Sequence, residues 1–475
     1  MADPDSTADH ALPGYHDATS SSAPPPRPPP PSQSVPSKSG SALETVHKYS
    51  LETGKGKAWV TLEVKSRAAN EKNLPLFVSG DEIAGVVSFN LDKSESLKGI
   101  VLSVTGGTTA VGQEEERFLE LSQELSPAAK LKGAHSFPFK LALPTECTPK
   151  GEKQTWPLPP TMSERASPAY IDYKLTVVIK RGALRVNQTL GTSFSYLPRS
   201  RPDPPSLLRE AAYREGVPLI GPDGDAEGWK VLKPLKIQGT IFDTREVEVE
   251  CTLAIATPLA YAIGTPIPLH LTFTSSDTQA LDLLANPRAP QCFLVRTHAV
   301  GSGATDVTAP RRSNNTFLEE CGKAVWWPVE EETPAQVAAR GEKNLGWEKE
   351  GSDGGKGSKR VLMGELEVRK GLKASFSFPK HCVWYSIALR SFTAPGFTYT
   401  PPAVGSSSSA GSEEFLLTER VTITTVPAAG PSPRAYAPPG YRDENNQGDY
   451  NTAIGFLENG NQRFYHHHGG TGWAP

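Results

Sequence analysis

Short stretches in which apolar and polar residues alternate recur along most of the chain. The clearest are residues 60–64, 173–179 and 247–253, where every second residue is apolar. A side-chain period of two is that of a β-strand with one face on a core and one face toward water. The 475 residues include 42 glycines and 44 prolines, which suit short strands joined by turns and do not suit a helical protein. We therefore expect an all-β chain of antiparallel, immunoglobulin-like sandwiches.

Changes in composition divide the chain. Both ends are rich in Ser, Pro or Gly and poor in apolar residues, so we expect them to be disordered. Two low-complexity stretches, near residues 329–360 and 404–414, are expected to be surface loops. The expected parts are a disordered arm at 1–43, a β-sandwich at 44–200, a connecting segment at 201–229, a second sandwich at 230–427, and a disordered tail at 428–475.

One short helix is expected in the connecting segment. Asp203 is a candidate N-cap, Pro204 follows it in the first turn, and Gly216 is a stop signal after a run of helix-forming residues. Leu207 and Leu208 lie on one side of this helix. We expect that side to pack near the junction of the two domains.

An internal repeat supports two similar domains. The segment Phe77–Ile83 reads FVSGDEI and Tyr261–Ile267 reads YAIGTPI, so each places a glycine three residues after an aromatic residue and an isoleucine three residues later. We predict that Gly80 and Gly264 occupy equivalent turns. Further on, Phe137–Phe139 precedes a strand with Tyr173, as Phe376–Phe378 precedes a strand with Tyr385. Signals that recur in the same order are typical of a duplicated fold.

The tail contains the tetrapeptide Pro438-Pro439-Gly440-Tyr441. Two prolines favour an extended left-handed helix, which presents a ridge to an aromatic groove at little entropic cost. A tyrosine two residues on fills a separate pocket. This PPxY pattern is the one that WW domains bind, so we predict that Pro438, Pro439 and Tyr441 contact a WW domain. The alternative is an ordinary proline-rich tail in which the pattern arises by chance.

These segments resemble those of the arrestin family. The aromatic-x-x-Gly-x-x-Ile segment, the strand over Phe137–Pro144 and the strand over Ala169–Leu175 are similar to the amino-terminal arrestin domain, and the copy from Trp229 onward resembles the carboxy-terminal one. The resemblance covers residues 45–427, and the PPxY tail is typical of α-arrestins. Some family features are missing: we find neither a paired-lysine phosphate sensor nor a buried charged core, and Leu219–Asp223 is not a good clathrin-binding box because it has a proline where an apolar side chain is needed.

The resemblance implies a function. An α-arrestin links cytosolic segments of membrane transporters or receptors to a WW-domain HECT ubiquitin ligase, which promotes ubiquitination, endocytosis and sorting of the cargo. Ubiquitin is also expected on the adaptor's own lysines. Such a protein is cytoplasmic and is recruited peripherally to the plasma membrane and endosomes. Two alternatives stay open: a ligase-independent trafficking scaffold of the retromer-subunit kind, and a secreted sandwich module.

Other classes of function find little support. The net charge of −3 gives no basic field for nucleic acid, and no run of eighteen apolar residues predicts a membrane-spanning helix. The polar, acidic start does not resemble a secretory signal, and five cysteines without a CxxC pair suit a reducing compartment. We find no hydrolase, metalloprotease or nucleotide-binding motif, so no enzyme, cofactor or metal is expected. The triplet His466–His468 is expected to be a solvated part of the tail.

Overall fold

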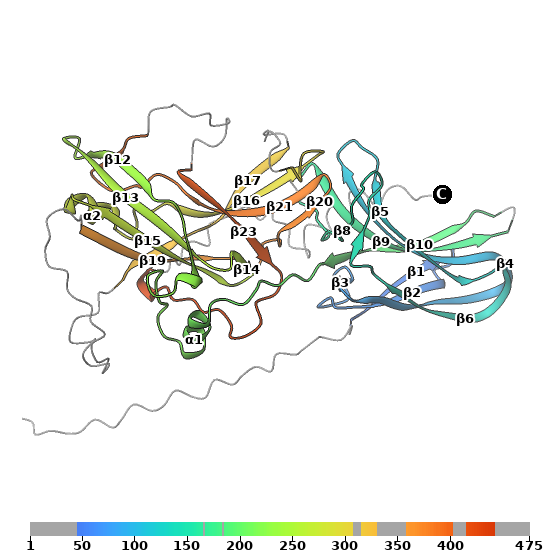
Figure 1. Ribbon diagram of the computed structural model, residues 1–475. Coiled ribbons are helices and arrows are strands. Elements are labelled where there is room, and N and C mark those ends of the chain that lie inside the picture. The colour runs from blue at the N-terminus through green and yellow to red at the C-terminus, as the bar shows by residue number, and fades with distance from the viewer. Residues whose placement is uncertain are drawn as a thin grey trace, which may run out of the picture. The chain divides into compact units, whose positions relative to one another are not determined.

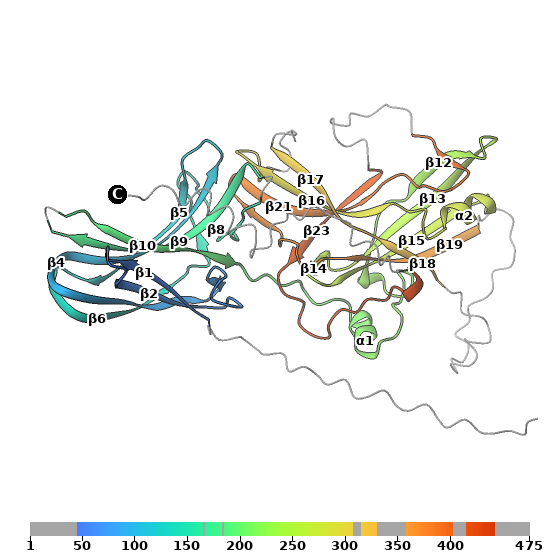
Figure 2. The ribbon, with the colours of Figure 1, turned by 180° about the vertical axis from the view of Figure 1, so that it is seen from behind.

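The computed structural model describes residues 45–164, 167–182, 185–306, 315–329, 358–401 and 415–441. Within these residues the chain is all-β, with two β-sandwiches in tandem and two short α-helices, as Figures 1 and 2 show from opposite sides. The predicted fold class is therefore confirmed. None of the helices in the described ranges has the length and apolar character needed to cross a membrane.

The first sandwich is organised around one long strand. Strand β4 has 29 residues and belongs to both layers: its first part pairs with β2 and β6, and its second part pairs with β5 and β9. Register shifts between the two parts let the strand bend. The strands are β1 (Thr45–Glu52), β2 (Ala58–Ser66), β3 (Leu76–Val78), β4 (Glu82–Ala110), β5 (Glu116–Ser126), β6 (Ala129–Ala142), β7 (Glu146–Cys147), β8 (Trp156–Pro157), β9 (Ala169–Arg181) and β10 (Gln188–Leu197).

The second sandwich has two separate sheets. One has the order β18-β19-β15-β13-β12-β22 with β11 beside β13, and the other β14-β23-β21-β16-β17 with β20 beside β21. The strands are β11 (Trp229–Val231), β12 (Leu235–Ile241), β13 (Arg245–Ala256), β14 (Ala260–Ala262), β15 (Pro266–Ser275), β16 (Cys292–Val300), β17 (Thr316–Lys323), β18 (Val325–Pro328), β19 (Ser358–Glu367), β20 (Phe376–Phe378), β21 (His381–Leu389), β22 (Phe397–Tyr399) and β23 (Leu417–Thr424).

The alternating residues form the core. The apolar members of residues 60–64, 173–179 and 247–253 are buried on β2, β9 and β13. Their polar neighbours are mostly half-buried or exposed, so the period of two identified the strands and their inner faces.

The helix of the connecting segment, α1 (Leu207–Glu215), exists, but two of its predicted details are wrong. Its N-cap is Ser206, whose side chain accepts a hydrogen bond from the Arg209 amide. The helix does not begin at Pro204, because this residue precedes Pro205 and a residue before a proline avoids the helical region. Its C-cap is Gly216, in the left-handed conformation, as expected. The face with Leu207 and Leu208 is exposed.

The buried face of α1 instead carries Arg209, Ala212 and Tyr213. The Arg209 guanidinium donates to the carbonyl oxygens of Gly228 and Thr257 and lies over the ring of Trp229. An arginine whose donors cap buried carbonyls can face inward, which a simple apolar pattern does not predict. A second helix, α2 (Thr278–Leu284), and the 3₁₀ turns η1 (Ala226–Gly228) and η2 (Pro439–Tyr441) were not expected.

The first predicted pair of the internal repeat, the segments around Gly80 and Gly264, is equivalent in the two sandwiches. Gly80 and Gly264 both have a positive φ, +87° and +80°, which favours glycine. Each follows a short strand that runs parallel to the last strand of its own sandwich, β3 beside β10 and β14 beside β23. Gly80 and Gly264 therefore lie at matching turns. The hydroxyls of Tyr173 and Tyr385 also match, because each donates to a carbonyl upstream in the chain at 2.6 Å.

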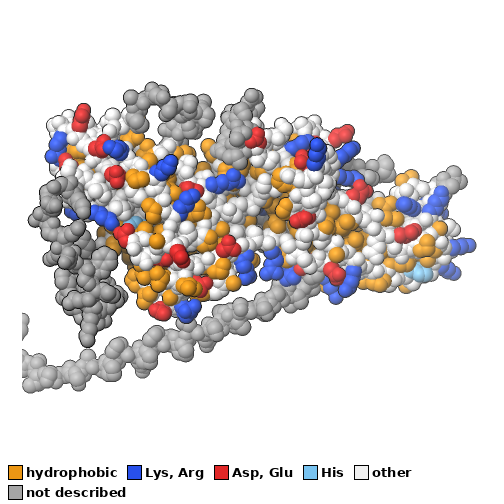
Figure 3. Space-filling model, in the orientation of Figure 1, with side chains coloured by type: hydrophobic (Ala, Val, Ile, Leu, Met, Phe, Trp, Pro, Cys, Tyr) orange, Lys and Arg blue, Asp and Glu red, His pale blue; other side chains and the backbone are white. Residues whose placement is uncertain are grey.

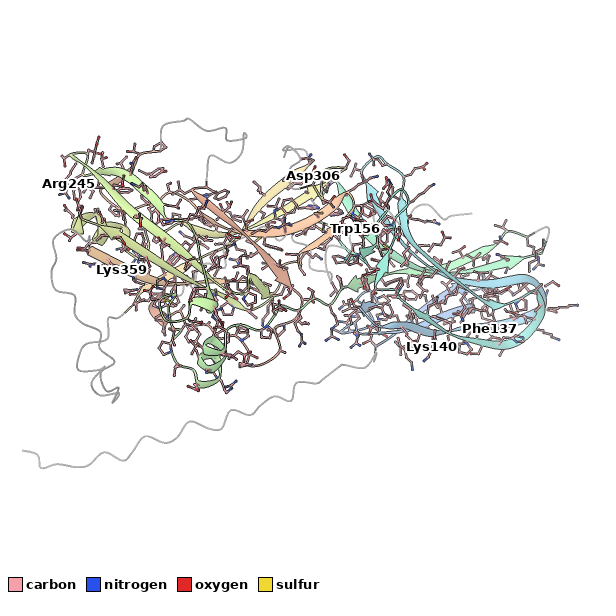
Figure 4. The ribbon with its side chains drawn as sticks, viewed as in Figure 1. Phe137, Lys140, Trp156, Arg245, Asp306 and Lys359 are labelled. Carbon is pink, nitrogen blue, oxygen red and sulfur yellow. The ribbon has the colours of Figure 1, made fainter. Side chains whose placement is uncertain are left out.

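The two phenylalanine pairs, by contrast, are not equivalent. Phe137–Phe139 lies on β6 and pairs with β4, whereas Phe376–Phe378 forms β20 and pairs with β21. Figure 4 labels Phe137 and Lys140 on β6, where Phe137 packs against the core and Lys140 extends into solvent. Aromatic residues two apart in sequence suit any half-buried strand, so this signal does not fix a position in the fold.

Candidate partner-binding site

The predicted ligand residues Pro438, Pro439 and Tyr441 lie at the end of the last described segment. Pro439–Tyr441 form the turn η2, in which the Tyr441 amide donates to the Pro438 carbonyl oxygen at 3.0 Å. Pro439 and Gly440 are exposed, and 40% of the Tyr441 surface is accessible. The expected extended left-handed helix is absent from this turn, because that conformation has no internal hydrogen bonds.

Residues 426–441, which we call the strap, are ordered. The expectation of disorder from residue 428 onward does not hold for residues 428–441; the remainder, 442–475, lies outside the described residues. In Figure 1 the strap is the red coil that leaves β23, passes beside α1 and ends near β18. At its start the strap is tied to Ser200 of the connection after β10. Thr425 and Ser200 exchange hydrogen bonds of 2.8–3.1 Å, and the Val426 amide donates to the Ser200 carbonyl oxygen.

The strap is held most firmly just before the motif. The Tyr436 ring stacks on Tyr213 of α1 with 6.2 Å between centroids. Its backbone amide donates to the Glu365 carboxylate of β19 at 2.7 Å, and Glu365 is buried. Ala437 is buried as well. A hydrogen bond to a buried carboxylate is stronger than one between neutral groups, so Tyr436 and Ala437 anchor the strap to the second sandwich.

A small cavity separates the strap from the fold. It is lined by residues of the connecting segment, α1, the β13–β14 turn and the strap, among them Arg209, Tyr213, Pro258 and Pro433. Its volume of about 40 Å³ suits one or two water molecules and not a cofactor.

Hydrophobic side chains also gather on the surface near α1, as Figure 3 shows. The large apolar residues exposed here are Leu207 and Leu208 of α1 and Val217 and Ile220 after it. Leu207 is 84% exposed, far more than packing would leave. Isolated exposed apolar residues are common on protein surfaces, and these four do not by themselves define a binding site.

A second polar site lies where the two sandwiches meet. The Arg296 guanidinium of β16 donates to both carboxylate oxygens of Glu164, at 2.6 and 2.9 Å, and lies 2.7 Å from Glu319 of β17. Burial alone would lower the pKa of Arg296, but the Glu164 carboxylate raises it above its ordinary value. Burial raises the pKa of Glu319 and lowers that of Lys373 nearby. The expectation that this chain has no buried charged core is therefore wrong.

The sequence could not reveal this core because Glu164 and Arg296 are 132 residues apart. A glutamate in a loop and an arginine on a strand are usually surface residues when each is considered alone. Two histidines nearby were also missed: the Nε2 atoms of His298 and His381 lie 2.7 Å apart, so one ring N–H donates a hydrogen bond to the other ring nitrogen. Burial lowers the pKa of both, that of His298 to about 4.

The triplet His466–His468 lies outside the described residues. Among the residues that the structure describes, no three His, Cys, Asp or Glu side chains are grouped to hold a metal ion. The five cysteines are all buried, and burial raises the pKa of each thiol, to about 11 for Cys147 and about 12 for Cys292.

Comparisons with known proteins add no identification at this point. No protein-family model matches the chain, and no curated protein matches it.

Proposed function

We propose that this protein is an arrestin-like adaptor of the α-arrestin kind, which links membrane-protein cargo to a ubiquitin ligase. Its double sandwich binds cytosolic segments of transporters or receptors, and Pro438–Tyr441 binds a WW domain of a HECT-type ligase. The ligase then transfers ubiquitin to the cargo, and to lysines of the adaptor, and the cargo is internalised and sorted. The protein acts in the cytoplasm and is recruited to the plasma membrane and endosomes.

One observation carries this proposal: a complete Pro-Pro-x-Tyr sequence stands on the surface of an all-β double sandwich. Pro439 and Gly440 are exposed and the Tyr441 ring is partly accessible, so a partner can reach all three. In the extended conformation the prolines supply a ridge for an aromatic groove, and the tyrosine supplies an anchor with a polar tip.

Cargo recognition in this proposal uses open sheet edges. Within the described residues, β1 pairs only with β2, and β17 pairs only with β16. An extended cargo segment can add to such an edge through main-chain hydrogen bonds. On β17, Leu318 is exposed and offers an apolar contact beside that edge.

The isolated motif provides the direct test. A peptide of residues 435–444 is expected to bind a WW domain of a HECT-type ligase with a dissociation constant on the order of tens of micromolar. Tyr441→Ala removes a central anchor, which costs about 2 kcal/mol, so binding should weaken roughly thirtyfold. Titration of the labelled peptide, followed by fluorescence polarisation, measures both constants.

Gly440→Ala is the matched control for that titration. Gly440 has no positive φ, and a Cβ built there meets no atom within 4 Å, so alanine suits the chain. Its peptide should bind as well as the wild type or slightly better, because alanine reduces the flexibility that binding removes. A wild-type peptide that binds no WW domain, or a Tyr441→Ala peptide that binds equally well, would refute the proposal.

The alternative is a ligase-independent trafficking scaffold with a retromer-subunit-like double sandwich. The turn at Pro439–Tyr441 favours it, because an ordered turn needs no WW domain to explain its prolines. The two functions differ in their need for Tyr441: the adaptor loses its ligase when this side chain is removed, and the scaffold keeps full activity.

A further inference from the structure

The motif and its anchor are parts of one ordered strap. Tyr436 and Ala437 are held against Tyr213 and Glu365, and Pro438 follows directly. Only one residue separates the Tyr436 amide, which is bound to Glu365, from the first proline of the motif. A WW domain that approaches this motif therefore meets a segment already engaged with α1 and β19.

The conformation of the docked motif differs from the one that a WW groove accepts. The hydrogen bond from the Tyr441 amide to the Pro438 carbonyl oxygen closes a 3₁₀ turn. In 3₁₀ structure in general, ψ is about −25°. The extended left-handed helix needs ψ near +145° and leaves the backbone free of internal bonds. Binding must therefore open the turn and change the path of the backbone next to the anchor.

We propose that docking of the strap masks the WW-binding motif by holding it in a turn that a WW groove does not accept, and that the Tyr436–Glu365 hydrogen bond is the latch of this docked state. This inference rests on the proposed function, since it concerns the availability of the same motif. A ligand that binds only an open state has an apparent dissociation constant equal to the intrinsic one divided by the open fraction. An open fraction of about one tenth makes binding tenfold weaker, which corresponds to ~1.4 kcal/mol.

The latch residues explain why the docked state is preferred. The Glu365 carboxylate is buried on β19 and receives the Tyr436 amide at 2.7 Å, a charge-assisted hydrogen bond. The Tyr436 ring covers the buried Tyr213 ring of α1. The Arg434 guanidinium reaches the carbonyl oxygen of Arg214 at 3.5 Å, near the end of the same helix. These contacts come from α1 and β19 and hold two residues of the strap, Arg434 and Tyr436.

The test compares the peptide of residues 435–444 with the full chain in titrations against one isolated WW domain. We expect the wild-type chain to bind about tenfold more weakly than the peptide, and Glu365→Ala to recover most of that difference. Glu365 is not part of the peptide, so its effect must act through the strap. The control is Glu367→Ala, which removes an exposed carboxylate two residues further along β19 and should change nothing.

Hydrogen exchange of residues 430–441 supplies a second measurement if Glu365→Ala disturbs the fold. The backbone amides of residues 436 and 441 should exchange slowly in the wild-type chain. Both amides should exchange faster in the Tyr436→Ala variant, and faster in the wild-type chain after the WW domain is added. A wild-type chain that binds as tightly as the peptide, or amides that exchange at the rate of a free peptide, would overturn the masking. Weak binding that Glu365→Ala and Tyr436→Ala leave unchanged would overturn the latch. Failure of the peptide itself to bind would instead remove the proposed function.

Discussion

Replacing Arg296 with methionine is expected to lower the free energy of unfolding by about 3–5 kcal/mol, the usual effect of removing one partner from a buried ion pair. Arg296 and Glu164 retain only 7% and 6% of their side-chain exposure, and Glu319 also faces the guanidinium. Methionine fills similar space but leaves both carboxylates without this cation. Urea unfolding followed by tryptophan fluorescence measures the loss.

The double variant Arg296→Met with Glu164→Met is the matched control. Because well-packed apolar residues often replace a buried ion pair at little cost, the double variant should be more stable than the single one. If Arg296→Met alone lost less than about 1 kcal/mol, the value typical of a surface pair, the buried charged core would not stabilise the fold.

Acid is expected to destabilise the protein well above the pH at which carboxylates titrate. Burial lowers the pKa of His270 and His298 to about 4, and that of His381 well below its ordinary range. In the unfolded chain these rings have a pKa near 6.5, so between about pH 6.5 and 4 the unfolded state binds more protons. The contribution of these histidines to the free energy of unfolding is therefore fully present above about pH 6.5. Below that pH it decreases by about 1.4 kcal/mol per pH unit for each histidine.

Urea unfolding at pH 7.5, 6.0 and 5.0 measures this slope. Burial raises the pKa of Asp172 and Glu319, which acts in the opposite direction, so a comparison of variants isolates the histidine contribution. His270→Gln should make the slope shallower by about one histidine's share, ~1.4 kcal/mol per pH unit. A stability that stays constant from pH 7.5 to 5.0 would contradict the burial of these rings as neutral groups.

The strands and the repeat were predictable from local pattern. Alternation at residues 60–64, 173–179 and 247–253 identified strands and their buried faces, because a period of two has only two faces to choose between. The segment around Gly80 and Gly264 was found because a left-handed turn between strands restricts the residue type. Which face of α1 is buried was not predictable, since the inward-facing Arg209 donates hydrogen bonds to the carbonyl oxygens of Gly228 and Thr257, which come later in the chain.

The site was predictable only as a motif. Pro438–Tyr441 can be recognised from four letters, but the strap cannot, because its anchor Tyr436 is a single aromatic residue in a proline-rich stretch and its partner Glu365 is 71 residues away. The same limit applies to the pair His298 and His381, 83 residues apart. Contacts of this kind depend on how the sheets are paired, and one sequence alone contains no signal for them.

The central claim is that this chain recruits a ligase through Tyr441 and recognises cargo through its sandwiches. Proximity labelling in cells tests both halves at once, with the intact chain compared with Tyr441→Ala and with Gly440→Ala as the control. We predict that WW-domain HECT ligases disappear from the labelled set of Tyr441→Ala while the membrane proteins remain, and that Gly440→Ala labels both. An unchanged yield of these ligases with Tyr441→Ala would contradict the account.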